Sequence, residues 1–181
     1  YYNQDNAAFA VAYHKHDLSI FYLKPKQFRN HYVQSASNMY LKEDVISFAQ
    51  KANGDGSFWL GTEDNGIYRV KIGNTDEVLE NRYPKRAATM IFQDSEGKLW
   101  TGLYHQGLMC SDGRSYFQGY APYDVIEINP SRFFVLINGE GLWVLNPKTG
   151  EKKRIPMENY WLMDMARVDN FIYTATPKYL Y

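Results

Sequence analysis

The chain has 181 residues, enough for one ordinary domain or for part of a larger one, and its 20 basic residues balance its 20 acidic residues. A formal charge of zero argues against nucleic acid as the main partner, because proteins that neutralise phosphates normally carry a basic excess. No apolar run approaches about 18 residues, which excludes a transmembrane helix from this segment and predicts that the segment itself makes no membrane contact.

The first predicted element is a pair of strands within residues 9–21, FAVAYHKHDLSIF. A turn that contains His14, Lys15 and His16 joins them. Residues 7–12 are rich in alanine, but their register with later strands outweighs the helix propensity of alanine. Aromatic residues make up 17% of the chain and favour strands throughout, so we expect essentially no helix.

Residues 45–71 carry the clearest strand pattern. Three strands are expected at Val45–Gln50, Phe58–Thr62 and Ile67–Lys71, with turns at Asn53–Gly56 and Glu63–Gly66. Glycine next to asparagine and aspartate supplies the positive φ angles that tight hairpins require. A less regular fourth strand is expected within Glu77–Tyr83, which completes a four-stranded unit.

Residues 89–111 repeat the same pattern. Four residues recur 41 positions later with no gap: Gly56, Trp59, Gly61 and Gly66 return as Gly97, Trp100, Gly102 and Gly107. Four matches at one offset rarely arise by chance. The fourth strand of this copy is expected within Arg114–Tyr120, and weaker copies occupy residues 9–21, 132–145 and 169–176, with a mean spacing of about 41 residues.

A repeat of about 40–45 residues with four strands is typical of propeller blades. The sequence therefore predicts an all-β fold, a β-propeller of four-stranded antiparallel blades with about four blades present. We expect one propeller segment that forms an incomplete arc of a larger propeller. Its approximate repeats are 1–40, 41–85, 86–121, 122–157 and the partial repeat 158–181.

The repeated residues have structural explanations. Trp59 and Trp100 are expected to pack between adjacent blades. Gly61 and Gly102, inside strands, would allow a neighbouring backbone or ring to approach closely. Glycines with positive φ are expected to end the turns, namely Gly66, Gly107 and Gly141. In the last repeat, residues 160–165 are expected to form a buried first strand.

These residues also resemble the two-component regulator propeller repeat, in which aspartate-glycine, tryptophan, glycine-threonine and a closing glycine with an apolar residue follow in order. One copy matches in full, through Asp55, Gly56, Trp59, Gly61, Thr62, Gly66 and Ile67. The next copy has Glu96 in place of aspartate and Leu103 in place of threonine, and a third keeps Gly141 and Leu142 but has Phe134 in place of tryptophan. The other copies are degenerate, so the specific resemblance depends on two repeats.

The resemblance implies a sensor rather than an enzyme. Propellers of this family form the extracytoplasmic sensor region of membrane-bound hybrid histidine kinases in Bacteroidetes, and their usual ligands are oligosaccharides. It therefore implies a periplasmic location and an oligosaccharide ligand. It also implies contact with the remainder of the propeller and sensor chain, and a homodimer formed through the parent protein.

Blade geometry predicts where a ligand would bind. Turns between second and third strands emerge on one face, together with the connections between blades. The repeat register gathers there polar residues that differ from blade to blade, which suits carbohydrate recognition on a fixed scaffold. The expected ligand-binding residues are His14, His16, Glu63, Asp64, Asn65, Tyr104, His105, Gln106, Asn138 and Glu140.

Two alternatives remain open: a protein-interaction propeller in secretion or assembly machinery of the bacterial envelope, and a carbohydrate-active enzyme. No catalytic residue is assigned, because Glu63 and Asp64 are neighbours in a turn, whereas a retaining glycosidase needs two carboxyls about 5–5.5 Å apart across a cleft. His14 and His16 lack an evident third ligand, and the single cysteine, Cys110, excludes an internal disulfide. We expect neither a metal nor a cofactor.

Overall fold

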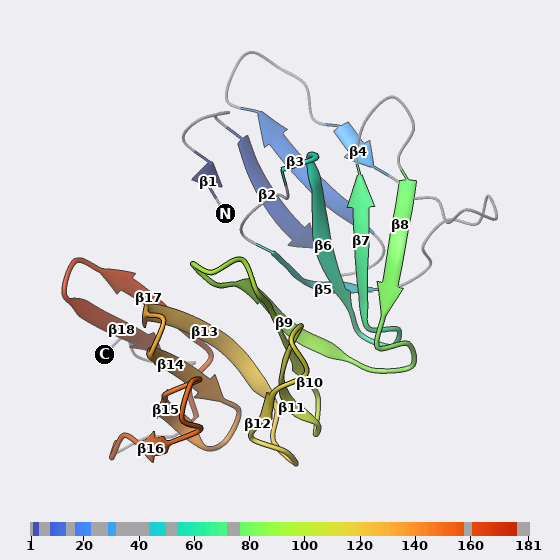
Figure 1. The fold of residues 1–181 in the computed structure, drawn as a ribbon. Helices are drawn as coiled ribbons and strands as arrows, with labels where there is room; N and C mark the ends of the chain where they lie inside the picture. The colour runs from blue at the N-terminus through green and yellow to red at the C-terminus, as the bar shows by residue number, and fades with distance from the viewer. Residues whose placement is uncertain are drawn as a thin grey trace. The chain divides into compact units, whose positions relative to one another are not determined.

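The computed structural model describes residues 2–3, 8–13, 17–22, 29–31, 44–49, 54–71, 77–157 and 161–176, and up to residue 31 it describes the backbone alone (Figure 1). Every regular element in these residues is a β-strand. Within the same residues, no helix has the length and apolar character needed to cross a bilayer. The predicted all-β class is therefore confirmed.

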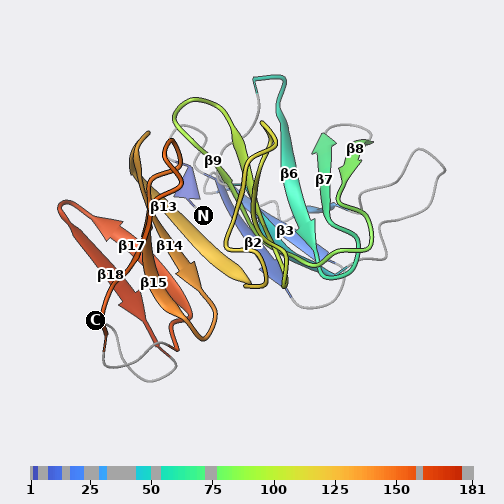
Figure 2. The ribbon, with the colours of Figure 1, turned by 60° about the horizontal axis from the view of Figure 1, so that its bottom comes forward.

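In the described part of the chain, four sheets have four strands each, and consecutive strands lie side by side as antiparallel neighbours (Figure 1, Figure 2). The first contains β1 (Tyr2–Asn3), β2 (Ala8–Tyr13), β3 (Asp17–Tyr22) and β4 (Arg29–His31). The second contains β5 (Val45–Phe48), β6 (Ser57–Thr62), β7 (Ile67–Lys71) and β8 (Glu77–Arg82). The third contains β9 (Ala88–Gln93), β10 (Leu99–Leu103), β11 (Gly107–Cys110) and β12 (Ser115–Tyr116). The fourth contains β13 (Pro122–Asn129), β14 (Arg132–Ile137), β15 (Gly141–Leu145) and β16 (Lys152–Arg154), and a two-stranded sheet of β17 (Asp164–Val168) and β18 (Phe171–Ala175) follows.

Each four-stranded sheet is one propeller blade, which confirms the predicted blade architecture. The less regular fourth strands lie within their expected ranges, as β8 and β12. The chain comprises two compact units, Tyr1–Ala88 and Thr89–Tyr181, and each is described by itself below.

The second unit has an apolar core between the sheets β9–β12 and β13–β16. The ring of Trp100 is fully buried, stacks on Tyr116 with 6.0 Å between centroids, and meets Phe133 edge-on at 5.3 Å. Since Phe133 belongs to the neighbouring sheet, Trp100 packs between two blades. The whole cluster consists of Met90, Trp100, Leu108, Cys110, Tyr116, Phe117, Val125, Phe133, Val135, Ile137 and Leu145.

The other face of β13–β16 packs against β17 and β18. Leu136 and Leu142 form one buried cluster with Leu162 and Met165, and Ile172 packs at its edge. Successive side chains along these strands point to opposite faces, so apolar residues form a buried core on each face of the β13–β16 blade. Figure 2 shows β17 and β18 beside this sheet.

The segment at residues 160–165 differs from the prediction of a buried strand. Leu162 and Met165 are buried, but Trp161 and Met163 are 59% and 55% exposed, and β17 starts only at Asp164. Successive side chains of an extended segment point to opposite faces, and a described sheet covers only one face of β17 and β18. Position 160 lies outside the described residues.

In the first unit, Leu60, Tyr68 and Val70 form the buried centre of the second sheet. Trp59 is 6% exposed, and the guanidinium of Arg82 lies 4.8 Å from the centre of its ring. The cation therefore covers one face of the indole, an arrangement that adds electrostatic attraction to the packing.

The glycines of the repeat mark two close approaches between backbones. A Cβ atom on Gly61 would lie 2.9 Å from the carbonyl oxygen of Ala88, and one on Gly102 would lie 2.6 Å from that of Pro122. Real Cβ atoms do not approach oxygen so closely, so only glycine fits without movement. The glycines in turns have positive φ angles: Gly56 78°, Gly66 74°, Gly97 82°, Gly107 95° and Gly141 77°.

Candidate functional site

The turn between β10 and β11 contains Tyr104, His105 and Gln106. The backbone N–H of Gln106 donates to the carbonyl of Leu103 at 3.0 Å, and His105 has a φ angle of 56°. Tyr104 is 48% exposed, and its ring lies edge-on to the His105 ring with 4.1 Å between centroids. The turn therefore holds two aromatic rings against each other at the surface.

The connection from β12 to β13 runs beside this turn. Nδ1 of His105 lies 3.3 Å from the carbonyl oxygen of Gly119, and the N–H of Gly107 donates to the carbonyl of Tyr120 at 3.1 Å. The side chain of Tyr120 is 41% exposed. These contacts place two exposed tyrosines, Tyr104 and Tyr120, on neighbouring segments.

The turn between β14 and β15 continues the same edge of the unit. The N–H of Asn138 donates to the carbonyl of Ala121 at 3.1 Å, and its Nδ2 donates to the hydroxyl of Tyr123 at 3.4 Å. The carboxylate of Glu140 pairs with Arg154 at 3.1 Å. Asn138 thus links its turn to the β12–β13 connection, whereas Glu140 has a cationic partner.

We name these three segments, residues 103–107, 117–123 and 137–141, the tyrosine rim. The structure brings together here five residues predicted from sequence, namely Tyr104, His105, Gln106, Asn138 and Glu140. Sequence reasoning missed Tyr120 and Tyr123. A signal for them existed, because connections between blades emerge on the same face as the turns between second and third strands.

The rim has chemistry suited to a small polar ligand. Its tyrosines offer flat apolar ring faces, each with a hydroxyl that donates and accepts hydrogen bonds. The amides of Asn138 and Gln106 add donors and acceptors of fixed geometry. Together these groups match a ligand with both C–H surfaces and hydroxyls.

The first unit carries the corresponding turn between β6 and β7. Glu63 and Asp64 are exposed on this turn. Asn65 instead holds the turn together, because its Nδ2 donates to the hydroxyl of Tyr68 at 2.6 Å and its Oδ1 accepts from the N–H of Lys85 at 3.1 Å. The other two predicted residues, His14 and His16, lie outside the described part of the chain.

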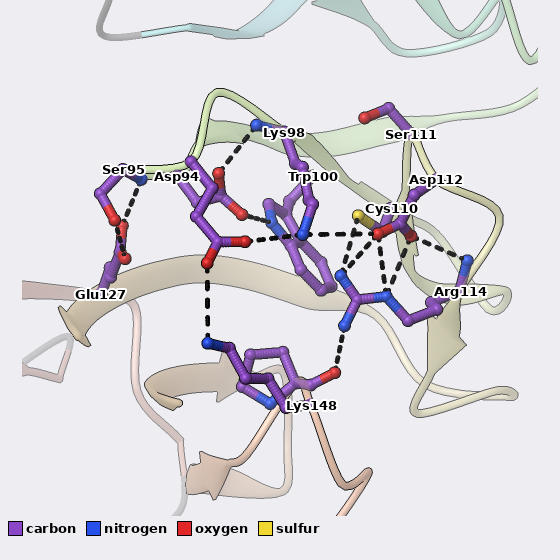
Figure 3. A network of polar contacts seen from close by, with 12 residues as sticks. Asp94, Ser95, Lys98, Trp100, Cys110, Ser111, Asp112, Arg114, Glu127 and Lys148 are labelled. Atoms are coloured by element: carbon purple, nitrogen blue, oxygen red, sulfur yellow. Dashed lines mark hydrogen bonds and ion pairs between the residues drawn. The ribbon is translucent and has the colours of Figure 1, made fainter. Parts of the chain in front are cut away.

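The other ends of β9 and β10 carry a polar network (Figure 3). The carboxylate of Asp94 accepts from the backbone N–H of Lys98 at 2.7 Å and from the indole N–H of Trp100 at 2.8 Å. Arg114 contacts the carboxylate of Asp112 at 2.6 Å. Hydrogen bonds from this guanidinium hold the pKa of Asp112 well below its usual range, because they favour the ionised carboxyl.

The same network joins two sheets. Ser95, on the β9–β10 turn, donates its backbone N–H to the carboxylate of Glu127 on β13 at 2.7 Å. Arg114 donates to the carbonyl of Pro147, which follows β15. Figure 3 shows these groups directed at one another across the two sheets. Because its groups bind one another across two sheets, this network has a structural role. The candidate site is therefore the tyrosine rim.

A carboxyl pair lies where β13 meets β17. Partial burial raises the pKa of Asp124 to about 6, and the negative charge of Asp164 adds to this shift. Each carboxylate also accepts from the backbone N–H of the next residue, Val125 at 2.7 Å and Met165 at 2.8 Å. This pair therefore places a carboxyl with a raised pKa at the contact between the two sheets.

A separate hollow of about 470 Å³ lies over β14, β15 and β16. Arg132, Val144 and Lys153 contribute to its walls. These residues belong to the flank of the sheet, whereas the candidate site belongs to its turns.

Comparison with known proteins finds no matching family model and no matching curated protein. Solved structures match the fold. The extracellular domain assigned to the one-component system BT4673 of Bacteroides thetaiotaomicron has 16% identity and a TM-score of 0.75. The extracellular domain assigned to the hybrid two-component system BT3049 of the same organism has 14% identity and a TM-score of 0.77. The matches cover 99% and 97% of this chain but only 27% and 25% of those two chains.

A chain of the COPII outer coat vertex, assembled on membranes, also matches, with 9% identity and a TM-score of 0.72 over 97% of this chain and 54% of that one. At such identities the likeness establishes the fold. It is a β-propeller segment of the kind found in extracellular domains of Bacteroides signalling systems, in agreement with the fold that the repeat resemblance implied. Because the coat protein shares it, function must be argued from the site.

Proposed function

We propose that this chain is a ligand-sensing segment in the extracytoplasmic region of a membrane-bound two-component regulator. On this proposal it lies in the periplasm and detects oligosaccharides. The fold that it shares with extracellular domains of a one-component and a hybrid two-component system supports the sensor role. The repeat resemblance supports the same role.

The tyrosine rim is the observation that carries the oligosaccharide part of the proposal. Exposed aromatic rings are costly to leave in water, and a surface that keeps several of them together is typical of a binding site. The rings of Tyr104 and Tyr120 would receive the C–H faces of sugar rings. The amide of Asn138 and the hydroxyl of Tyr123 would receive sugar hydroxyls.

The segment itself acts without catalysis in this proposal. The parent chain would carry a cytoplasmic histidine kinase, and a homodimer formed through that parent would transmit the signal. The remainder of the propeller would be the main protein partner of the segment.

Calorimetric titration of the whole extracytoplasmic region against a panel of oligosaccharides tests the proposal. We expect saturable binding of at least one glycan. Failure of every glycan to bind, together with a parent reading frame that encodes neither a membrane helix nor a kinase, would overturn it.

A second candidate is a propeller that binds another protein in the cell envelope, and the shared fold is compatible with it because a chain of a coat assembly has the same fold. Pull-down of a stable partner whose binding is indifferent to sugars would favour it. A carbohydrate-active enzyme would instead form a product, and the substitutions Glu63→Gln or His105→Ala would abolish that activity.

A further inference from the structure

The tyrosine rim carries little charge. Its three segments contain one acidic side chain, Glu140, and no lysine or arginine. The carboxylate of Glu140 pairs with Arg154 at 3.1 Å, and the same guanidinium donates to the carbonyl of Glu140 at 2.8 Å. The three rim segments therefore contribute no lysine or arginine of their own, and the ammonium of Lys152 on β16 lies 5.3 Å from the centre of the buried Phe117 ring.

Charge separates two classes of glycan. Sulfated and uronic-acid glycans carry anions, which proteins bind with arginine forks, lysines or clusters of backbone N–H groups. Neutral glycans carry only hydroxyls and C–H faces, which are bound by aromatic rings and by side-chain amides. The three rim segments supply the second set of groups.

The Tyr104 ring and the backbone of the rim are held in place before any ligand arrives. Tyr104 lies against the His105 ring at 4.1 Å, and His105 contacts the carbonyl of Gly119. The backbone of Tyr120 is fixed by the hydrogen bond from Gly107. Binding on such a surface loses little conformational freedom, which favours recognition by a few rings.

We propose that the tyrosine rim binds neutral oligosaccharides and discriminates against sulfated and uronic-acid glycans. Tyr104 and Tyr120 are its two stacking surfaces, and Asn138 with the hydroxyl of Tyr123 forms its hydrogen-bonding pair. This inference rests on the proposed function and names the class of ligand that the sensor takes.

Titration of the full chain with matched glycans tests the inference. Each neutral oligosaccharide is paired with a sulfated or uronate counterpart of the same length. We expect the neutral member of a pair to bind at least tenfold more tightly. Tyr104→Ala and Tyr120→Ala should each weaken that binding about tenfold, because each removes one stacking surface.

Two control variants distinguish a loss of binding from a loss of folding. Tyr104→Phe keeps the ring and should retain binding within about threefold of the unmodified chain. Phe171→Ala removes an aromatic side chain that is 66% exposed on β18, outside the rim, and should leave binding unchanged. Thermal unfolding of each variant shows whether it is folded.

Three outcomes are distinguishable. Tighter binding of the anionic member, or normal binding by both alanine variants, overturns the inference while glycan binding itself still supports the proposed function. Absence of binding by every glycan overturns the inference and the oligosaccharide part of the proposed function, and the parent reading frame then decides whether the sensor role stands. Preference for the neutral member, with losses confined to the rim variants, supports both.

Discussion

Gly102 lies so close to Pro122 that a Cβ atom at position 102 would be 2.6 Å from the carbonyl oxygen of that proline. The hydroxyl of Thr89 donates to the same oxygen. The second strand of one sheet and the first strand of the next therefore meet at a position where a side chain has no room. The same relationship holds in the first unit between Gly61 and Ala88.

Gly102→Ala should destabilise the second unit by about 2–3 kcal/mol, because the added methyl group would press on a backbone oxygen that cannot rotate away. Urea denaturation followed by tryptophan fluorescence measures the change. Gly54→Ala is the matched control, since a Cβ there would meet nothing within 4 Å. Its effect should stay within about 0.5 kcal/mol. Equal effects of the two substitutions would contradict this explanation.

Asp94→Ala should cost about 2–3 kcal/mol, because it leaves the indole N–H of the fully buried Trp100 without its acceptor. Asp94→Asn keeps one side-chain oxygen and should cost less. Denaturation midpoints of both variants against the unmodified chain test this order. If asparagine proves as harmful as alanine, the charge of the carboxylate matters more than its hydrogen bond to Trp100.

The stability of the second unit should depend on pH through Asp124. Its pKa is about 6 in the folded chain against an ordinary value of 3.8, so the folded state holds the proton more tightly than the unfolded state. The contribution of this carboxyl is therefore fully favourable below about pH 4, is lost as the pH rises to about 6, and stays lost above. Asp124→Asn should abolish this loss and raise the free energy of unfolding at pH 7.5 by about 1–3 kcal/mol.

Urea titrations of both chains between pH 4 and pH 8 measure this effect of Asp124. The two stability curves should converge toward pH 4, separate as the pH rises to about 6, and keep a constant difference above that. Asp164→Asn should shrink the separation without removing it, since Asp164 is the secondary cause of the shift. Parallel curves would show that Asp124 titrates normally.

Cys110 should resist thiol reagents in the folded chain. Its side chain is 2% exposed, and burial raises the pKa of the thiol, so little reactive thiolate exists at pH 8. Labelling with a chromogenic disulfide should be slow in buffer and complete in denaturant. Gly102→Ala should accelerate the labelling, because Cys110 belongs to the same core as Met90, which an added Cβ at position 102 would press against. Rapid labelling of the unmodified chain would contradict the buried placement.

Much of the fold could be predicted because the same glycines, in strands and in turns, recur in two copies of the repeat, and these residues determine the backbone conformation. Gly61 and Gly102 are 41 positions apart, and the structure shows a close backbone approach at both. The turn residues also predicted where strands begin and end. The strand expected at Ile67–Lys71 coincides with β7. Residues that recur at this spacing are required by the backbone conformation, and that conformation is common to all the blades.

Side-chain partners could not be predicted in the same way. Asn65 and Asn138 lie in corresponding turns, and each reaches the next connection between blades by different atoms. The side-chain oxygen of Asn65 accepts from the N–H of Lys85. The backbone N–H of Asn138 donates to Ala121, and its side-chain amide donates to Tyr123. The ion pair of Glu140 joins residues of different strands, and no repeat position marks it. Such contacts depend on residues that differ between blades, so a pattern found in one blade does not transfer to the next.

Main-chain hydrogen bonds tie the segments of the tyrosine rim together, from Gly107 to Tyr120 and from Asn138 to Ala121. Neither bond requires a particular side chain at the tips. The tip residues can therefore be exchanged one by one while the framework stays intact, and on the proposed function each exchange would change the ligand that the rim binds. The same property makes these loops suitable for grafting, in which a tip taken from a relative would bring its specificity along with it.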